Sequence, residues 1–337
     1  MNEPASIAVW GAGAIGGVIG AHLVKSGVEV LFVDADRDHV AAINRAGLAI
    51  AGPIASFRIR ARALTPEQVS GSFDCVFLAV KGHHTASAAM ALAPHLAADG
   101  VVVSLQNGLN GDALVAAVGR ARAILALVNF AADVVAPGEI FYGGRGSVVL
   151  GELGGARSNR LAMLVQMLGA FDPSVTGSDN VLGYLWGKLG YGSILIGTAL
   201  TAETIPVVLD DLALRPVLAG IGRELMLAAA ADSVTPVGVD GFDAQAFLIG
   251  DPVRVAASFG AMADHYRHSE KNRTGVWRDL AVRKRKTEVA ALLEPTIAIG
   301  ARYGVAMPLT TCLVRAIGEI EDGRRDFAMA NIPALAA

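Results

Sequence analysis

The sequence predicts an α/β protein of two domains, in which a doubly wound sheet of mainly parallel strands is followed by an all-helical domain. Three observations predict this class. Short apolar runs alternate with helical patterns early in the chain, and a glycine-rich turn joins the first strand to the first helix. Beyond Asn180, apolar residues recur at the 3.6-residue spacing of helices. The length of 337 residues agrees, since a domain usually holds about 100–200 residues.

Strands and helices alternate from the start of the chain. Ile7–Trp10 is a short apolar run that stops at a glycine, residues 14–26 have a helical pattern, and residues 28–33 read as a second strand. The same reasoning predicts further helices at residues 39–46, 84–97 and 112–118, and further strands near residues 48–59, 75–80 and 101–105. Such alternation is typical of a parallel sheet wound in both directions.

The pattern changes after residue 124. Short strands with Pro-Gly and Gly-Gly turns are predicted up to residue 150, and a helix at residues 159–171 closes this half. The second half is expected to be helical at residues 182–200, 212–231, 259–265 and 278–303. We therefore predict a Rossmann-like domain over residues 1–176 and a helical substrate or dimerisation domain over residues 177–337.

The composition excludes several classes of protein. Lys and Arg number 28 against 31 Asp and Glu, a formal net charge of −3, whereas proteins that coat nucleic acid usually carry a basic excess. Hydrophobic residues make up 53% of the chain and charged residues 18%, so the chain must bury a large core. Every apolar stretch is interrupted before the roughly 18 residues that a membrane span needs. We therefore expect neither a nucleic-acid partner nor a membrane partner.

The side chains that bind metals do not form a recognisable pattern. Cys75 and Cys312 lie far apart and match no metal-ligand spacing, and the adjacent His83 and His84 have no third ligand apparent in the sequence. The N-terminus resembles no targeting segment, and the low cysteine content suits a reducing compartment. We predict that no metal is bound and that the protein is cytoplasmic.

The glycine-rich turn has the pattern that binds a dinucleotide. The six residues that begin at Gly11 read Gly-Ala-Gly-Ala-Ile-Gly, after a strand and before a helix. Gly11 would make the turn, Gly13 would let the pyrophosphate approach, and Gly16 would let the helix pack on the sheet. Ala14 and Ile15 complete the predicted cofactor-binding segment at the helix N-terminus. The alternative is a packing turn that binds no ligand.

Asp34 ends the second predicted strand, 21 residues after Gly13 because 34 − 13 = 21. An acidic residue at this point accepts hydrogen bonds from the adenosine ribose, which favours NAD over NADP. Arg37 follows closely and offers a partner for the 2′-phosphate of NADP. Alternatively, Asp34 caps the next helix, although Asp36 and Asp38 are better placed for that.

Two polar residues follow neighbouring strands of the predicted sheet. Lys81 ends one strand and Asn107 ends the next, at the edge where open α/β sheets bind ligands. Together with residues 186–189 (Trp-Gly-Lys-Leu) and 285–289 (Arg-Lys-Thr-Glu-Val), they resemble the ketopantoate reductase (2-dehydropantoate 2-reductase) family. The likeness covers nearly the whole chain in the right order and spacing.

The resemblance implies an NAD(P)-dependent reductase that transfers a hydride to a small 2-oxo acid and produces a 2-hydroxy acid. By motif, Lys188 matches the catalytic lysine and Asn107 the asparagine beside the nicotinamide and the substrate. Lys81 matches a cofactor-side lysine, and Glu288 matches the substrate-binding glutamate. These residue types suit the chemistry, because hydride addition leaves negative charge on an oxygen that a cation or proton donor must stabilise. A homodimer is a further expectation.

Each of these residues also has a purely structural interpretation. Lys188 could be a surface lysine whose stem packs on its apolar neighbours. Asn107 begins an Asn-Gly turn, and Lys81 could simply end its strand. Glu288 lies four residues after Lys284 and could form a helical surface ion pair with it.

The C-terminal motif contains a dense group of basic residues. In the helix predicted at residues 278–303, Arg278, Arg285 and Glu288 would share roughly one face. Most of this basic group is expected to be solvated surface. Arg278 or Arg285 is nevertheless a candidate for holding an anionic substrate.

Two departures from the family pattern lie at recognition positions. Pantoate-pathway members typically carry asparagines four and eight residues after the catalytic lysine, where this chain has Gly192 and Ile196. The family usually ends its second strand with arginine, where this chain has Asp34. These differences indicate a paralogue with another substrate and another cofactor preference.

Two other functions remain open on the sequence alone. One is a two-domain dehydrogenase of the 6-phosphogluconate or opine type, which shares the glycine turn and a helical second domain. The other is a non-catalytic redox sensor that binds a dinucleotide and a protein partner.

Overall fold

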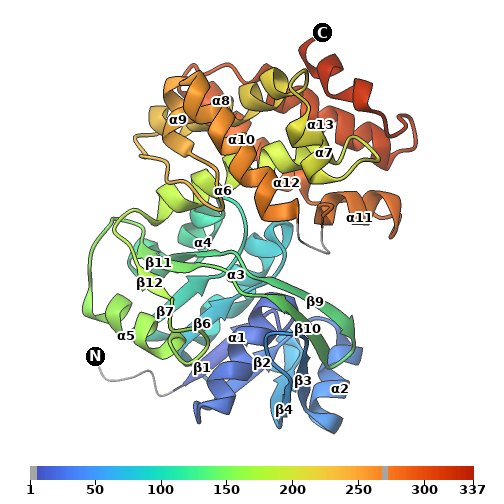
Figure 1. Cartoon of the computed structure of the whole chain (residues 1–337). Coiled ribbons are helices and arrows are strands. Elements are labelled where there is room, and N and C mark those ends of the chain that lie inside the picture. Colours follow the sequence, from blue (N-terminus) through green and yellow to red (C-terminus); the bar gives the residue numbers. More distant parts are fainter. Residues whose placement is uncertain (1–5, 268–271) are drawn as a thin grey trace. The chain divides into compact units, whose positions relative to one another are not determined.

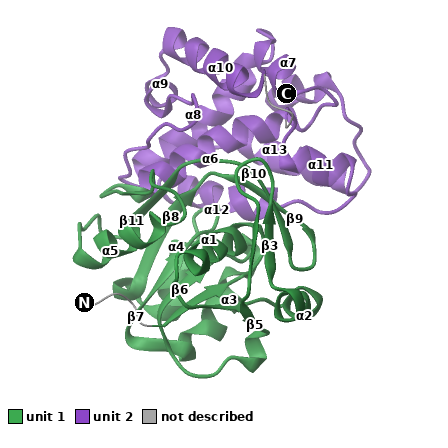
Figure 2. Cartoon of the chain, turned by 60° about the horizontal axis from the view of Figure 1, so that its bottom comes forward, with its two compact units in different colours: residues 1–181 green, residues 182–337 purple. Residues whose placement is uncertain are grey.

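The computed structural model describes residues 6–267 and 272–337 (Figure 1). The chain forms two compact units, Met1–Val181 and Leu182–Ala337 (Figure 2). The boundary predicted after residue 176 falls inside the short strand β12 (Thr176–Gly177), which pairs with β11 (Val148–Glu152) in the sheet of the first unit. The sheet of the first unit therefore extends slightly beyond the predicted domain.

The main sheet of unit 1 confirms the predicted doubly wound architecture. Its strand order is β12-β11-β8-β7-β6-β1-β2-β5. The further strands are β1 (Ile7–Trp10), β2 (Val30–Val33), β5 (Arg62–Leu64), β6 (Phe73–Leu78), β7 (Leu96–Ser104) and β8 (Ala123–Val128). These strands pair in parallel, whereas β11 runs antiparallel to β8. Strands such as β1 and β8 are buried along their whole length, as expected for strands covered on both faces.

The helices of unit 1 connect and cover these strands. They are α1 (Ala14–Lys25), α2 (Arg37–Ala46), α3 (Thr85–Leu92), α4 (Gly111–Val118) and α5 (Asn159–Leu168). The helix predicted at residues 84–97 is shorter than expected, since a 3₁₀ turn with a proline replaces its last part at Ala93–His95. Helix α1 contacts strands of the main sheet and also strands β9 (Ala131–Ala136) and β10 (Glu139–Gly144).

A second sheet in unit 1 was not anticipated from the sequence. Its order is β4-β3-β10-β9, with β3 at Leu48–Ala51 and β4 at Phe57–Ile59. The short strands themselves were predicted, but the parallel pairing of β3 with β10 joins segments far apart in the chain. Local periodicity carries no information about such a pairing.

Unit 2 is helical, as predicted. It contains α6 (Val181–Thr198), α7 (Ile205–Asp210), α8 (Arg215–Ala231), α9 (Ala244–Ile249), α10 (Pro252–Arg267), α11 (Gly275–Ala281), α12 (Val289–Arg302) and α13 (Pro308–Glu321). The continuous helix predicted at residues 278–303 is wrong, because α11 ends at Ala281 and α12 begins only at Val289. Between them Lys284 has a φ of +51°, which no α-helix allows.

Nearly all the apolar residues of helix α6 in unit 2 are buried. Trp186 and Ile194 are almost fully buried, while Tyr184, Lys188 and Gly192 form a half-buried stripe at four-residue spacing. Despite this apolar character, none of the helices within residues 6–267 and 272–337 has both the length and the hydropathy that crossing a bilayer requires.

Candidate functional site

The predicted site residues of unit 1 follow four neighbouring strands. The register places Val33, Trp10, Leu78 and Ser104 in one row across β2, β1, β6 and β7. The glycine turn, Asp34, Lys81 and Asn107 come directly after these strands. The sheet therefore brings all the unit 1 site residues to one carboxyl edge, which is where open α/β sheets bind ligands.

Two glycines of the turn are required by close packing. Gly11 has a φ of +101°, and a Cβ atom there would lie 2.7 Å from the backbone of Ala79 and Val80. A Cβ at Gly16 would collide with the Gly11 carbonyl oxygen and would lie 2.7 Å from a methyl carbon of Val9. These contacts hold the turn against β6 and the helix against β1.

Gly13 differs from the other two glycines of the turn. A Cβ at Gly13 would meet no other described atom within 4 Å, and Gly13, Ala14 and Ile15 are all partly exposed. Gly13 is the N-cap of α1 and has no side chain to satisfy the first backbone N–H groups of the helix. An open cradle at a helix N-terminus fits the pyrophosphate of a dinucleotide.

His39 braces the glycine turn, a role that was not predicted from the sequence. Its side chain is only 3% exposed. The Gly138 N–H donates to His39 Nδ1 at 3.0 Å, so the ring proton lies on Nε2, which donates to the Ala12 carbonyl oxygen at 3.0 Å. No local pattern could have found this contact, because it joins α2, the turn and the β9–β10 hairpin.

Asp34 lies at the predicted place and does not cap the following helix. Asp36 is the N-cap of α2 and accepts the N–H groups of Asp38 and His39. Asp34 is half-buried, and its Oδ1 accepts the Asp36 N–H at 2.9 Å. The carboxylate is therefore held at the end of β2, where an adenosine ribose would lie in a dinucleotide site.

A buried amide ties together the loops that carry Lys81 and Asn107, which are themselves exposed. Gln106 Nε2 donates to the Val80 carbonyl oxygen at 2.9 Å and to Thr85 Oγ1 at 2.7 Å. Gln106 was not predicted to be a site residue. Its position next to Asn107 at a strand end was the available signal, since a polar residue buried there needs partners.

Lys188 is half-buried on α6 of unit 2. Burial lowers the pKa of its ammonium group to about 8, while the carboxylate of Asp240 acts in the opposite direction. A surface lysine would not lose so much proton affinity. One turn further, a Cβ at Gly192 would meet no described atom within 4 Å, whereas Ile196 is only 7% exposed and belongs to the core.

Glu288 lies at the start of α12 and is half-buried. The preceding residue anchors this helix start, because the N–H and the hydroxyl of Thr287 both donate to Glu321 Oε1, at 2.8 and 2.6 Å. The helical ion pair between Glu288 and Lys284 is ruled out, since Lys284 lies outside any helix.

The basic group before α12 is arranged differently from the prediction. Arg278 lies in α11, and Arg285 lies in the loop after it, so these residues and Glu288 do not share a helix face. Both Arg283 and Arg285 bind the carboxylate of Asp279, with nitrogen–oxygen distances of 2.9 Å. Pairing to Asp279 makes Arg285 a weaker candidate for an anionic substrate.

The described cysteine and histidine side chains do not converge on a metal site. In the described part of the chain, no three His, Cys, Asp or Glu residues are grouped so that they could hold a metal ion. Cys75 is buried, and burial raises the pKa of its thiol to about 12. The rings of His83 and His84 lie against each other in a tilted arrangement, with centroids 4.1 Å apart.

Comparison with known proteins places the chain in one family. The family model described as "Ketopantoate reductase PanE/ApbA" matches residues 7–155, and the model for the C-terminal part of that family matches residues 180–321. Among solved structures, a PanE/ApbA family ketopantoate reductase from Ralstonia eutropha JMP134 is 26% identical, with a TM-score of 0.80 over 95% of this chain and 99% of that one.

Two curated relatives give the same result. The 2-dehydropantoate 2-reductase of Mesorhizobium japonicum is 30% identical over 69% of this chain and 79% of that enzyme. The one of Pyrococcus abyssi is 31% identical over 58% of this chain, and the match spans 65% of that enzyme, just under two thirds. With both family models matching in sequence order and the fold shared over nearly the whole length, this chain belongs to the ketopantoate reductase family of oxidoreductases.

Proposed function

We propose that this protein is a nicotinamide-dependent reductase that converts a small 2-oxo acid to the 2-hydroxy acid, with Lys188 as the general acid. The observation that carries the proposal is the half-buried Lys188, whose pKa is lowered to about 8. An acid with a pKa near the working pH can both give up a proton and recover it within a catalytic cycle.

The residues of unit 1 hold the cofactor in this proposal. The open backbone at Gly13, Ala14 and Ile15 binds the pyrophosphate, with Gly11 and Gly16 fixing the shape of the turn. Asp34 accepts the ribose hydroxyls. Lys81 lies on the cofactor side of the same sheet edge. The bound dinucleotide supplies the hydride.

Lys188, Asn107 and Glu288 act on the substrate. As a hydride adds to the carbonyl carbon, the electron pair of the C=O π bond moves to the oxygen, which takes a proton from Lys188 Nζ. The neutral amine then regains a proton from water, so charge and atoms balance. Asn107 orients the reacting groups, and Glu288 binds a polar group of the substrate.

For the cofactor, we propose a preference for NAD over NADP. The carboxylate of Asp34 stands where the 2′-phosphate of NADP would bind, and like charges repel. Arg37 is exposed nearby and could neutralise that phosphate, but it already attracts another carboxylate. That carboxylate is Glu67, whose pKa is lowered mainly by a hydrogen bond from Thr65 and further by the positive charge of Arg37.

For the substrate, we propose a small 2-oxo acid other than 2-dehydropantoate, the compound named for the relatives. Gly192 leaves open space one helical turn from Lys188, so the substrate has room there for a larger group than a side chain at this position would allow. Ile196 is buried in the core and offers no hydrogen bond. A homodimer also stays a prediction, which the mass in solution would test.

The test is a screen of 2-oxo and 2-hydroxy acids with each nicotinamide cofactor, followed by absorbance of the reduced nicotinamide. Lys188→Ala should reduce kcat on the best substrate by about 100- to 10,000-fold, because it removes a positioned acid. Lys25→Ala, which removes an exposed lysine of unit 1, is the matched control and should be unchanged.

Two outcomes would contradict the proposal. Near-normal turnover by Lys188→Ala would refute the role of this lysine. If no acid is turned over while the dinucleotide binds tightly and promotes binding of a protein partner, the protein is a redox sensor instead.

A further inference from the structure

A pair of tyrosines lies next to Lys188 in unit 2. Tyr191 follows Lys188 by three residues on α6 and is only 5% exposed, and its hydroxyl oxygen lies 2.6 Å from that of Tyr266 on α10. Burial raises the pKa of both phenols, and the carboxylate of Asp240 raises each of them further. The charge of Asp240 therefore acts on Lys188, Tyr191 and Tyr266 alike.

A tight turn presents Asp240. The N–H of Phe242 donates to the carbonyl oxygen of Val239 at 2.8 Å, which closes a four-residue turn. Both central residues have positive φ, +46° at Asp240 and +86° at Gly241, as in a type I′ turn. Left-handed backbone is unfavourable for most residues other than glycine, although aspartate and asparagine tolerate it best.

Two glycines of α6 bring this turn onto the helix that carries Lys188. A Cβ at Gly187 would collide with the carbonyl oxygen of Val237, whose N–H donates to the Gly183 carbonyl oxygen at 3.0 Å. A Cβ at Gly190 would lie 2.9 Å from the ring of Phe242. The segment that leads into the turn and the residue that ends it thus both rest on α6, on either side of Lys188 in sequence.

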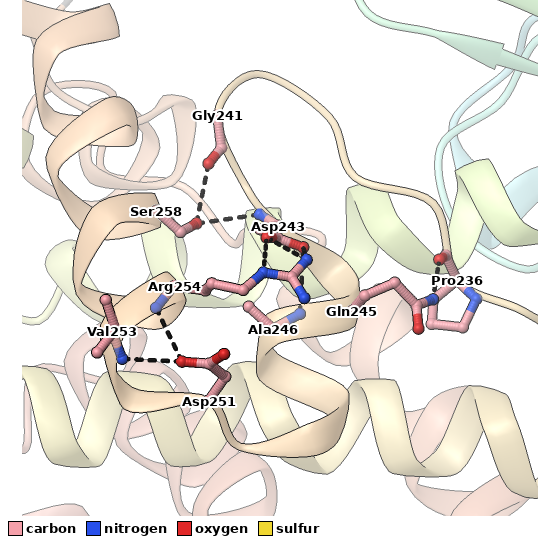
Figure 3. Close-up of polar contacts among 9 residues, drawn as sticks. All are labelled: Pro236, Gly241, Asp243, Gln245, Ala246, Asp251, Val253, Arg254 and Ser258. Atoms are coloured by element: carbon pink, nitrogen blue, oxygen red, sulfur yellow. Dashed lines mark hydrogen bonds and ion pairs between the residues drawn. The ribbon is translucent and has the colours of Figure 1, made fainter.

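Helix α10 also braces the turn (Figure 3). The hydroxyl of Ser258 donates to the Gly241 carbonyl oxygen at 2.9 Å and accepts the Asp243 N–H at 3.0 Å. The carboxylate of Asp243 binds Arg254 through both of its oxygens and also caps α9 by accepting the Ala246 N–H. These bonds hold the left-handed backbone at Asp240 in place.

The other described carboxylates of the helices around α6 are engaged elsewhere. Glu224 of α8 accepts the backbone N–H groups of Leu309 and Thr310 in α13. Asp264 of α10 binds Arg267, and Asp243 binds Arg254. Among the residues that the structure describes, Asp240 is the charged group that acts on Lys188.

We propose that Asp240 is a positioning residue that keeps Lys188 protonated for catalysis, held in place by the turn on α6 and α10. This inference rests on the proposed role of Lys188 as proton donor. Burial favours the neutral amine, and the opposing carboxylate restores part of the proton affinity. The adjacent tyrosine pair has two hydroxyl protons, of which one bridges the two oxygens and the other is available to an acceptor.

The test measures the pKa of Lys188 directly, by NMR titration of the labelled lysine side chain assigned with Lys188→Arg. Asp240→Asn should lower the pKa of Lys188 by about one pH unit or more, which is the usual effect of losing a nearby opposite charge. Asparagine also tolerates a left-handed backbone, so the turn should survive. Asp240→Glu should restore part of the loss, and Asp264→Asn on α10 is the control that should change nothing.

The same shift should appear in turnover. The alkaline limb of kcat/KM for reduction should move to lower pH in Asp240→Asn by the amount seen in the titration, because only the protonated lysine donates. If Asp240→Asn fails to fold, Ser258→Ala is measured instead. This variant keeps the Asp240 carboxylate but removes a hydrogen bond that holds the turn, so it should lower the pKa of Lys188 by a smaller amount.

An unchanged pKa of Lys188 in Asp240→Asn, or in Ser258→Ala where that is the variant measured, would overturn the inference. The titration requires no substrate, so it stands apart from the proposed function. A shifted pKa without turnover of any 2-oxo acid would overturn the proposed function and leave the electrostatic role of Asp240 intact. Turnover of a 2-oxo acid together with an unchanged pKa of Lys188 in the variant would overturn the role of Asp240 and leave the proposed function intact.

Discussion

The glycine turn of unit 1 and helix α6 of unit 2 use glycine in the same two ways, but over very different stretches of chain. In unit 1, Gly11 and Gly16 allow close packing and Gly13 leaves open space, all within one short turn. In unit 2, Gly187 admits a distant segment of backbone, and Gly192 leaves open space. The difference teaches that a local site leaves a readable motif, whereas a site assembled from distant segments does not.

The largest effect is expected at the open glycine of unit 1. Gly13→Val should abolish dinucleotide binding, weakening it at least about 100-fold, or about 2.7 kcal/mol, because the branched side chain fills the place of the pyrophosphate. Titration calorimetry with NADH measures this. Gly318→Val, at another position where a Cβ meets no described atom, is the control. Binding by Gly13→Val within threefold of the wild type would show that the turn is not a cofactor cradle.

The next effect concerns the cost of burying Lys188. Its pKa is about 8 in the folded protein against 10.5 for an ordinary lysine, so charging it costs at most about 3 kcal/mol. Water that reaches the half-buried side chain reduces this figure. Lys188→Met should therefore raise the free energy of unfolding even as it destroys activity, as is common at functional sites.

The stabilisation expected for Lys188→Met should depend on pH. Because the folded pKa is depressed, the penalty is fully present below pH 8, where the folded wild type must hold the charge. It disappears as the pH rises from about 8 to 10.5, where both states become neutral. The melting temperature of Lys188→Met should exceed that of the wild type at pH 7, and the difference should shrink at pH 10. A lower melting temperature at pH 7 would contradict it.

A pair of substitutions on α6 sharpens the comparison between close packing and open space. Gly187→Ala should destabilise the protein by about 1–3 kcal/mol, because its methyl group would collide with the Val237 carbonyl oxygen. Gly192→Ala, on the same helix, should stabilise it by up to about 1 kcal/mol through helix propensity. Denaturant unfolding measures both. Equal effects of the two substitutions would mean that the segment before Asp240 does not rest on α6.

A modest effect is expected at Asp34. A carboxylate and a phosphate 4 Å apart repel by about 4 kcal/mol per pair of unit charges at an effective dielectric constant near 20, and exposure reduces this considerably. The wild type should favour NAD, and Asp34→Arg should move the preference towards NADP by about tenfold, or about 1.4 kcal/mol. The ratio of kcat/KM values for the two cofactors measures it. A wild type that favours NADP tenfold would overturn the proposed preference.

Several site features were predictable because they are local. The strand–turn–helix around Gly11 needs only neighbouring residues, and Asp34, Lys81 and Asn107 were placed by the rule that ligands bind at strand ends. Lys188 and Glu288 were chosen by likeness to a family, not by any local physical signal. The prediction of one continuous helix that carries Glu288 was wrong, because the apolar periodicity of the sequence continues across a loop of basic residues.

The amino-acid sequence by itself determined the class of fold, the glycine turn and the edge of the sheet where site residues gather, because each depends on residues within one or two elements. Asp240 shows the limit. The Asp-Gly pair between Val239 and Phe242 is a recognisable turn signal. Only the tertiary structure decided that this turn rests on α6 beside Lys188 and that His39 braces the glycine turn. The pKa of a lysine depends on burial and on charges within a few ångströms, and those neighbours come from segments that folding alone brings together.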